Sequence, residues 1–148
     1  MEEKKIVVFD IDGTLSIVGD RIKHLQKTPP DWDAFYGACG EDAVNEQILD
    51  IYTAMWEAGY KIYFVTGRRE SCRKDTVNWM QEYYIEWSDE EHLLMRKDGD
   101  FRHDTVIKPE LIEGIKEAVY IIFEDRNSMV KKWRELGYTC LQVADGDF

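Results

Sequence analysis

The stretch Ile6-Val7-Val8-Phe9-Asp10-Ile11-Asp12-Gly13-Thr14-Leu15 decides the fold of this chain. It begins with a short, continuous apolar run, which is typical of a central strand buried on both faces of a parallel sheet. Asp10 and Asp12 follow at the tip of that strand, and their spacing turns both carboxylates to the same side. Two such anions repel each other by about 4 kcal/mol at a separation of about 4 Å. We therefore expect a counter-charge beside them, unless they form a plain solvated turn.

Further apolar runs alternate with segments of helical periodicity along the rest of the sequence. The additional predicted strands cover residues 60–65, 93–95, 119–123 and 139–143. The spacing of apolar residues predicts helices over residues 44–58, around Val77, Met80 and Tyr84, over residues 109–118 with Pro109 in the first turn, and around Met129, Trp133 and Leu136. Such alternation indicates a mostly parallel sheet with helices on both faces. We expect one α/β domain over residues 1–148, with residues 16–42 forming a loop with one or two short helices beside the site.

The charge balance of the chain argues against two classes of binding partner. The 148 residues include 19 Lys and Arg against 30 Asp and Glu, which gives a net charge of −11. This balance argues against an extensive nucleic-acid surface and against binding to an anionic membrane. No apolar run approaches the length of a membrane span, and the first residues lack the core of a signal peptide. Three cysteines without paired spacing favour free thiols, so we expect a cytoplasmic protein.

Polar side chains follow the other long strands at the points where those strands are expected to end. Thr66-Gly67-Arg68 follows the second strand, and Glu124-Asp125-Arg126 follows the strand over residues 119–123. Lys108 stands before the helix expected at Pro109. Because ligands bind at the carboxyl ends of parallel strands, we expect a hydroxyl, several carboxylates and a lysine to meet at one edge of the sheet.

These motifs, namely Asp10-x-Asp12-Gly13-Thr14, Thr66-Gly67-Arg68, Lys108 and Glu124-Asp125, resemble in order and spacing the four motifs of the haloacid dehalogenase (HAD) superfamily. The resemblance implies a Rossmann-like HAD fold with no cap or a minimal one. It also implies a Mg²⁺-dependent phosphomonoesterase that works through an aspartyl-phosphate. On this resemblance Asp10 is the nucleophile and Asp12 the general acid and base. The metal is then held by Asp10, the main-chain carbonyl of Asp12, and Asp125.

The residue types agree with that chemistry. A carboxylate can serve as a covalent nucleophile, and Mg²⁺ prefers oxygen ligands. The Thr66 hydroxyl can donate to a phosphoryl oxygen, and Lys108 can neutralise charge that develops on the transferred group. A general acid requires a raised pKa, which we expect for Asp12 from its neighbours. We also expect Pro109 to hold Lys108 in an extended backbone conformation.

Within the superfamily, the chain is similar to the 3′-phosphatase domains of phage polynucleotide kinase/phosphatases. The similarity rests on Gly19-Asp20-Arg21, on the stretch from Thr66 to Ser71, on Glu124-Asp125-Arg126 and on the run over residues 129–148. The sequence holds no GxxxxGK[ST] loop, so we expect no phosphate transfer from ATP. Carried over by position, the resemblance implies substrate-side roles for Arg21, Arg68, Asp104 and Arg126.

Alternative interpretations stay open for some of these residues. Asp104 could instead orient Lys108, and Arg126 could form an ion pair with Glu124 or Asp125. Trp32 could stack on a base or simply pack in its loop.

Three functions are consistent with the sequence. The first is a 3′-phosphatase of nucleotides or strand ends, as in the repair of DNA or RNA ends. The second is a small-molecule phosphatase or 5′-nucleotidase of the same fold. The third is a binding protein that retains the fold without turnover. The sequence predicts no particular oligomeric state.

Overall fold

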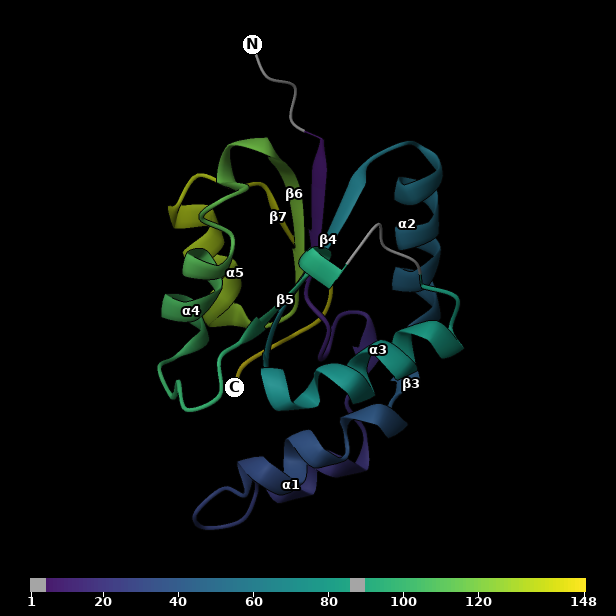
Figure 1. Cartoon of the computed structure of the whole chain (residues 1–148). Coiled ribbons are helices and arrows are strands. Elements are labelled where there is room, and N and C mark those ends of the chain that lie inside the picture. The colour runs from purple at the N-terminus through teal and green to yellow at the C-terminus, as the bar shows by residue number, and fades with distance from the viewer. Residues whose placement is uncertain (1–4, 86–89) are drawn as a thin grey trace.

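A parallel sheet runs through the centre of the computed structural model, which describes residues 5–85 and 90–148 (Figure 1). Within these residues the sheet has five strands in the order β5-β4-β1-β6-β7. They are β5 (Leu93–Arg96), β4 (Lys61–Arg69), β1 (Ile6–Phe9), β6 (Val119–Glu124) and β7 (Cys140–Gln142). Every neighbouring pair is parallel. The α/β sheet expected from the sequence is thus confirmed, and β1 occupies its middle.

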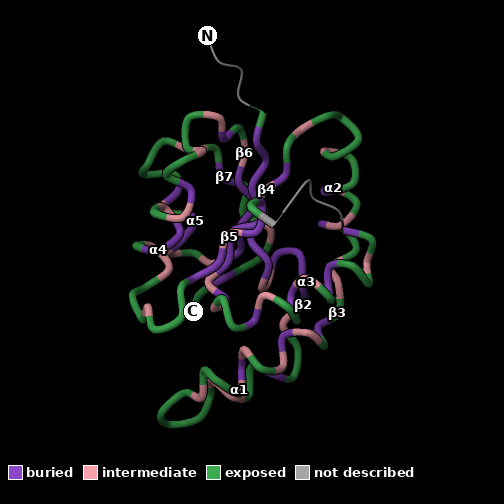
Figure 2. The backbone as a smooth tube through the Cα atoms, in the orientation of Figure 1, coloured by how far each residue is buried: buried purple, intermediate pink, exposed green. Residues whose placement is uncertain are grey.

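Helices cover both faces of the sheet (Figure 1). Helices α2 (Glu46–Glu57) and α3 (Arg73–Glu82) lie on one face, and α4 (Asp104–Leu111) and α5 (Asn127–Glu135) lie on the other. Alternate residues of β1 enter two separate cores, because successive side chains of a strand point to opposite faces. One core joins Val7, Phe9, Tyr52 and Trp79, and the second joins Ile6, Val8, Met129 and Trp133. Figure 2 shows these buried strands between the more exposed outer faces of the helices.

Residues 16–44 form a small layer beyond the carboxyl end of the sheet (Figure 1). Its elements in chain order are β2 (Ser16–Ile17), the 3₁₀ turn η1 (Asp20–His24), α1 (Trp32–Gly37), the 3₁₀ turn η2 (Cys39–Glu41) and β3 (Ala43–Val44). Strands β2 and β3 pair antiparallel and so close the base of the layer. The small size of this layer agrees with the minimal cap that the HAD resemblance implies. In the part of the chain that the structure describes, each helix is too short or too polar to cross a lipid bilayer.

The predicted position of the helix over residues 109–118 is wrong. Helix α4 begins at Asp104, and Pro109 lies inside it rather than in its first turn. The cause is a local cap, since the ring nitrogen Nδ1 of His103 accepts a hydrogen bond from the backbone N–H of Thr105 at 3.2 Å. The expectation of an extended backbone at Lys108 is therefore wrong too, because Lys108 is helical.

Three smaller expectations also differ from the structure. Val44 belongs to β3, not to the helix after it, because it pairs with Ser16. Tyr84 lies beyond the end of α3, with a positive φ of 56° and an exposed side chain. Strand β4 continues as far as Arg69, so Thr66-Gly67-Arg68 lies within the strand rather than after it.

Candidate active site

Side chains from four elements meet at the carboxyl end of the sheet. Asp10 follows β1, Thr66 belongs to β4, Lys108 belongs to α4 and Asp125 follows β6. All four line one cavity of about 480 Å³, and Asp12 lines it with them. The structure therefore brings together the side chains that the sequence motifs singled out, as the geometry of a parallel sheet requires.

The carboxylate of Asp10 is buried and held at both oxygens. Lys108 Nζ donates to its Oδ1 at 2.8 Å, and the hydroxyl of Thr14 donates to its Oδ2 at 3.0 Å. Burial raises the pKa of Asp10 well above its ordinary value, and the carboxylates of Glu124 and Asp125 raise it further, while Lys108 opposes them. The lysine is thus the counter-charge that the sequence analysis expected beside Asp10.

Lys108 lies between two buried carboxylates. Its Nζ is 2.8 Å from Asp10 Oδ1 and 2.9 Å from Glu124 Oε2. Burial lowers the pKa of Lys108, but the charges of Asp10, Glu124 and Asp104 outweigh this effect and raise it well above its ordinary value, so the amine stays a cation. Glu124 also accepts a hydrogen bond from the backbone N–H of Asp125 at 3.2 Å through Oε1. Glu124 therefore positions the lysine, a role that the sequence analysis did not assign to it.

The same carboxylates form an acidic cluster that suits a divalent cation. Asp10, Glu124 and Asp125 each offer one oxygen, and these oxygens lie within 4.8 Å of one another. Oxygen donors of this kind fit Mg²⁺, a hard cation. Burial and the Glu124 carboxylate raise the pKa of Asp125 to about 6, even though Asp10 and Lys108 oppose the shift. A cation here would offset the mutual repulsion of these anions.

Gly13 explains how the turn after β1 fits against this cluster. Its backbone has a φ of +82°, a left-handed conformation that side-chain-bearing residues rarely adopt. A Cβ atom at this position would overlap the carboxylate of Asp125. The glycine therefore allows the chain to turn close beside the acidic cluster.

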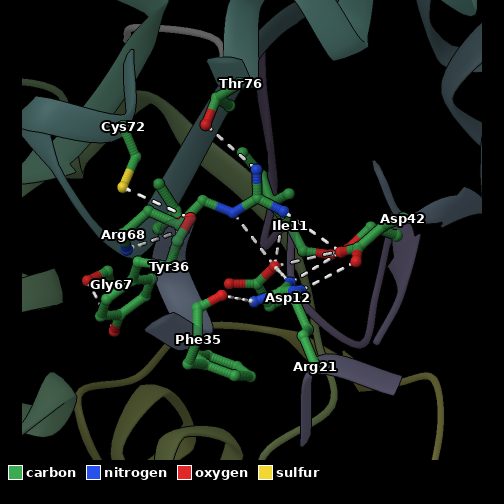
Figure 3. Close-up of polar contacts among 12 residues, drawn as sticks. Ile11, Asp12, Arg21, Phe35, Tyr36, Asp42, Gly67, Arg68, Cys72 and Thr76 are labelled. Carbon is green, nitrogen blue, oxygen red and sulfur yellow. Dashed lines mark hydrogen bonds and ion pairs between the residues drawn. The ribbon is translucent and has the colours of Figure 1, made fainter. Parts of the chain in front are cut away.

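Two arginines hold the carboxylate of Asp12 (Figure 3). The Nη2 atoms of Arg21 and Arg68 lie 2.5 Å and 2.6 Å from Asp12 Oδ1, and Arg68 Nε lies 3.0 Å from the same oxygen. Asp42 receives two further bonds from Arg21, at 2.8 Å from Nε and 2.6 Å from Nη2. Arg68 in turn donates to Thr76 Oγ1 at 3.0 Å. Both guanidinium groups are buried, so their orientation is fixed by these partners.

The pKa of Asp12 moves in the direction opposite to our expectation. Burial raises it, but Arg68 and Arg21 outweigh burial and lower the pKa to about 2. The prediction of a raised pKa is therefore wrong for this arrangement, because it did not include the two arginines. Oδ1 accepts all of the arginine bonds, together with a weaker one from Ser16 Oγ at 3.4 Å. Because these hydrogen bonds all end on Oδ1, the two oxygens of Asp12 differ, and Oδ2 is the one suited to proton transfer.

The four predicted substrate-side residues fall into two pairs. Arg21 and Arg68 point at Asp12, and direct contact of either with substrate stays a prediction. Arg126 and Asp104 contact each other, with 3.1 Å between Nη1 and Oδ2. The alternative ion pair of Arg126 with Glu124 or Asp125 is therefore wrong. Asp104 is shared with Arg96, whose Nη2 donates to Asp104 Oδ1.

Asp42, Thr76 and Arg96 are site-supporting residues that sequence reasoning missed. Arg96 follows the strand predicted over residues 93–95, so the rule that functional residues follow strands could have found it. Asp42 and Thr76 carry no such signal. Asp42 lies in the aperiodic segment between two predicted elements, and Thr76 lies on a helix that faces the arginine only in the folded chain.

Comparisons with known proteins agree with this geometry. The family model described as Polynucleotide kinase PNKP phosphatase domain (HAD_PNKP) matches residues 4–148. A protein of Autographa californica nuclear polyhedrosis virus, described as a candidate bifunctional polynucleotide kinase/RNA ligase, is 28% identical over 139 residues, which are 89% of this chain and 18% of that protein. A chain of the Pnkp1/Rnl/Hen1 RNA repair complex is 31% identical with a TM-score of 0.84, over 99% of this chain and 44% of that chain.

A more distant structure shares only the fold. The haloacid dehalogenase-like hydrolase SP0104 from Streptococcus pneumoniae has a TM-score of 0.62 at 15% identity, over 93% of this chain and 83% of that chain. The present chain spans less than half the length of the viral relative and of the RNA-repair chain.

Proposed function

Because this chain belongs to the family of polynucleotide kinase phosphatase domains, among the HAD hydrolases, we propose that it removes the phosphate from 3′-phosphorylated nucleotides and strand ends. We take residues 1–148 as one phosphatase domain. The observation that carries the proposal is the arrangement of Asp10, which is held by Lys108 and Thr14 in the cavity that Asp12 also lines. The description of the longer viral relative also mentions kinase and ligase activities, which we do not propose for this chain.

Asp10 acts as the nucleophile in the first step. One of its oxygens attacks phosphorus, a P–O bond forms, and the bond from phosphorus to the 3′ oxygen of the leaving nucleoside breaks. The product is an aspartyl-phosphate on Asp10, a form of carboxylate catalysis known in other phosphotransferases. Thr14 and Lys108 keep the attacking carboxylate in place, so little rearrangement is needed before attack.

Asp12 transfers the proton in both steps. With both arginines beside it, Asp12 is ionised before substrate binds. The negative charge of an incoming phosphate raises its pKa, since a like charge disfavours the carboxylate. Oδ2 then takes a proton from solvent and passes it to the 3′ oxygen as that oxygen leaves phosphorus. In the second step the same oxygen takes a proton from the water that attacks phosphorus, the P–O bond to Asp10 breaks, and free phosphate leaves with the Asp10 carboxylate restored.

Thr66 and Lys108 stabilise the transferred phosphoryl group. The hydroxyl oxygen of Thr66 accepts a hydrogen bond from the backbone N–H of Arg68 at 3.1 Å, which leaves its own O–H free to donate to a phosphoryl oxygen. Lys108 supplies a buried positive charge at the same end of the cavity. Preorganised donors of this kind act on the charge that develops in the transition state.

Asp10 and Asp125 would hold the proposed Mg²⁺ ion, together with the main-chain carbonyl of Asp12. Oδ1 of Asp12 is engaged by the arginines, and we assign Oδ2 to proton transfer, so the side chain of Asp12 is not among the proposed ligands. When bound, the cation offsets the negative charge of the acidic cluster and of the substrate phosphate. Glu124 belongs to the same cluster, but its Oε2 is occupied by Lys108.

The three buried cysteines, Cys39, Cys72 and Cys140, are free thiols. They support the proposed cytoplasmic location, because reduced thiols persist in a reducing compartment.

The test of the function compares the position of the phosphate on matched substrates. Short oligonucleotides and nucleosides with a 3′-phosphate or a 5′-phosphate are incubated with the protein and Mg²⁺, and released phosphate is measured. We expect turnover of the 3′-phosphates and little of the 5′-phosphates. Equal turnover of both would favour a small-molecule phosphatase or 5′-nucleotidase, and no turnover of any would favour a binding protein.

A further inference from the structure

The cavity that holds Asp10 has two chemically different sides. One side carries the acidic cluster with Lys108 and Thr66, and the other comes from the layer over residues 16–44. The second side is mostly apolar. Besides Ser16 it includes Ile17, Ile22, Leu25, Trp32, Phe35 and Tyr36. The charged groups that suit a phosphate lie on the first side, and the second side suits a part of the substrate that has an apolar face.

Among the aromatic side chains of this layer that line the cavity, Trp32 is the most exposed. It is the first residue of α1, and it keeps 42% of its surface exposed while it lines the cavity. Its indole stacks on the ring of Tyr36, with 5.9 Å between ring centroids and 27° between planes, and it meets Phe35 edge-on at 5.8 Å. The indole is thus supported by two rings and still retains accessible aromatic surface.

The aromatic cluster of Trp32, Phe35 and Tyr36 is tied to the catalytic residues at two points. The hydroxyl of Tyr36 donates to the backbone carbonyl of Gly67 at 3.2 Å, next to Thr66. The guanidinium of Arg21, which holds Asp12, lies 4.3 Å from the ring centroid of Phe35 and donates to its backbone carbonyl at 3.4 Å. Trp32 is therefore connected to the active-site elements through its two ring neighbours, Phe35 and Tyr36.

We propose that the aromatic cluster is the subsite for the terminal base of the substrate, with Trp32 as the stacking residue. This inference rests on the proposed function, since it places the base of the nucleotide whose 3′-phosphate meets Asp10. Every base has an aromatic face, so stacking recognises a strand end without reading its sequence. With a net charge of −11, the chain has little electrostatic attraction for a long phosphate backbone, and contact with one terminal nucleotide suits it better.

The experiment uses two 3′-phosphorylated oligonucleotides that differ only in whether the terminal residue carries a base or is abasic. For the wild type, we expect the oligonucleotide with the base to have a KM lower by roughly five- to a hundredfold, the range that stacking of one base contributes. Trp32→Ala should raise KM for that substrate to the abasic value and leave the abasic KM unchanged. Trp32→Phe should retain most of the preference.

Two controls separate stacking from loss of structure. Trp56→Ala removes another part-exposed indole, on α2 beside Tyr52 and away from the residues that line the cavity, and should leave both KM values unchanged. The comparison within the wild type needs no variant, so a folding defect in Trp32→Ala cannot obscure it. An equal rise in both KM values for Trp32→Ala would leave the preference for the base intact without the indole, so it would indicate a structural role and overturn the proposal.

The outcomes also distinguish this subsite from the function on which it rests. Phosphate release from both oligonucleotides at equal KM in the wild type would overturn the stacking role and leave the 3′-phosphatase proposal intact. The absence of release from either oligonucleotide would overturn the proposed function, and the subsite with it.

Discussion

Arg68 donates two hydrogen bonds to Asp12, from Nε at 3.0 Å and from Nη2 at 2.6 Å, and both end on the same carboxylate oxygen, Oδ1. The arginine belongs to β4 and the aspartate follows β1, so this contact joins the tips of two neighbouring strands. Arg68 is itself fixed by Thr76 on α3. The orientation of the proposed general acid is therefore determined by a side chain that is fully buried.

Replacement of Arg68 by lysine should lower kcat by roughly tenfold or more. Lysine retains the positive charge but lacks the planar fork that contacts Asp12 and Thr76 together, and hydrogen bonds to charged groups contribute about 1.5–3 kcal/mol each. Steady-state kinetics on a 3′-phosphorylated oligonucleotide measures the effect. Arg102→Lys is the matched control, because that exposed arginine pairs with Asp100 and Glu110 and does not line the cavity, and it should change kcat little. If Arg68→Lys retained half of the wild-type kcat, the positioning role would be excluded.

Removal of the positive charge of Lys108 should lower kcat more than the replacement of Arg68 by lysine. Lys108→Met should reduce kcat by about 10²-fold or more, by analogy with the loss of one transition-state donor. Asp10 and Glu124 would also face each other without a cation between them, so circular dichroism should first show that the variant is folded. Lys116→Met, at an exposed ion pair with Glu113, serves as the control. A loss below threefold in Lys108→Met would contradict the assignment.

Magnesium binding should weaken as the pH falls. Burial raises the pKa of Asp10 well above its ordinary value, and burial with Glu124 raises that of Asp125 to about 6. Both carboxylates must be ionised to hold the cation, so protons compete with it increasingly as pH falls through 6. Titration calorimetry should therefore give a higher Kd for Mg²⁺ at pH 5 than at pH 7.5.

The same proposal predicts that EDTA abolishes activity and that excess Mg²⁺ restores it. Full turnover in excess EDTA, or an equal Kd for Mg²⁺ at pH 5 and pH 7.5, would argue against the metal site.

Gly13→Ala should lower the free energy of unfolding by about 1–3 kcal/mol, the usual penalty for a strained backbone conformation. The backbone there has a φ of +82°, and the new Cβ would overlap the carboxylate of Asp125. Urea denaturation measures the change. Gly114→Ala is the control, because a Cβ at that position meets open space, and its effect should stay within about 0.5 kcal/mol. Equal stability of the two variants would show that the turn tolerates a side chain.

The sequence predicted the sheet because its strands are marked by uninterrupted apolar runs, and β1 matches its predicted range of residues 6–9. It did not predict the start of α4, because the cap comes from His103, which is not a common N-cap residue. Nor did it predict the low pKa of Asp12. That value depends on the balance between burial and the two arginines, and Arg21 and Arg68 approach Asp12 only in the folded chain.

The central claim is that Asp10 becomes phosphorylated during turnover. The protein is mixed with a 3′-phosphorylated oligonucleotide and Mg²⁺, quenched rapidly and treated with borohydride, which reduces an aspartyl-phosphate to homoserine. Mass spectrometry of the peptides then identifies the reduced residue. We predict homoserine at position 10 in the wild type and none in Asp10→Asn. Reduction at a different residue, or an unmodified Asp10 in samples quenched while phosphate is being released, would contradict the account.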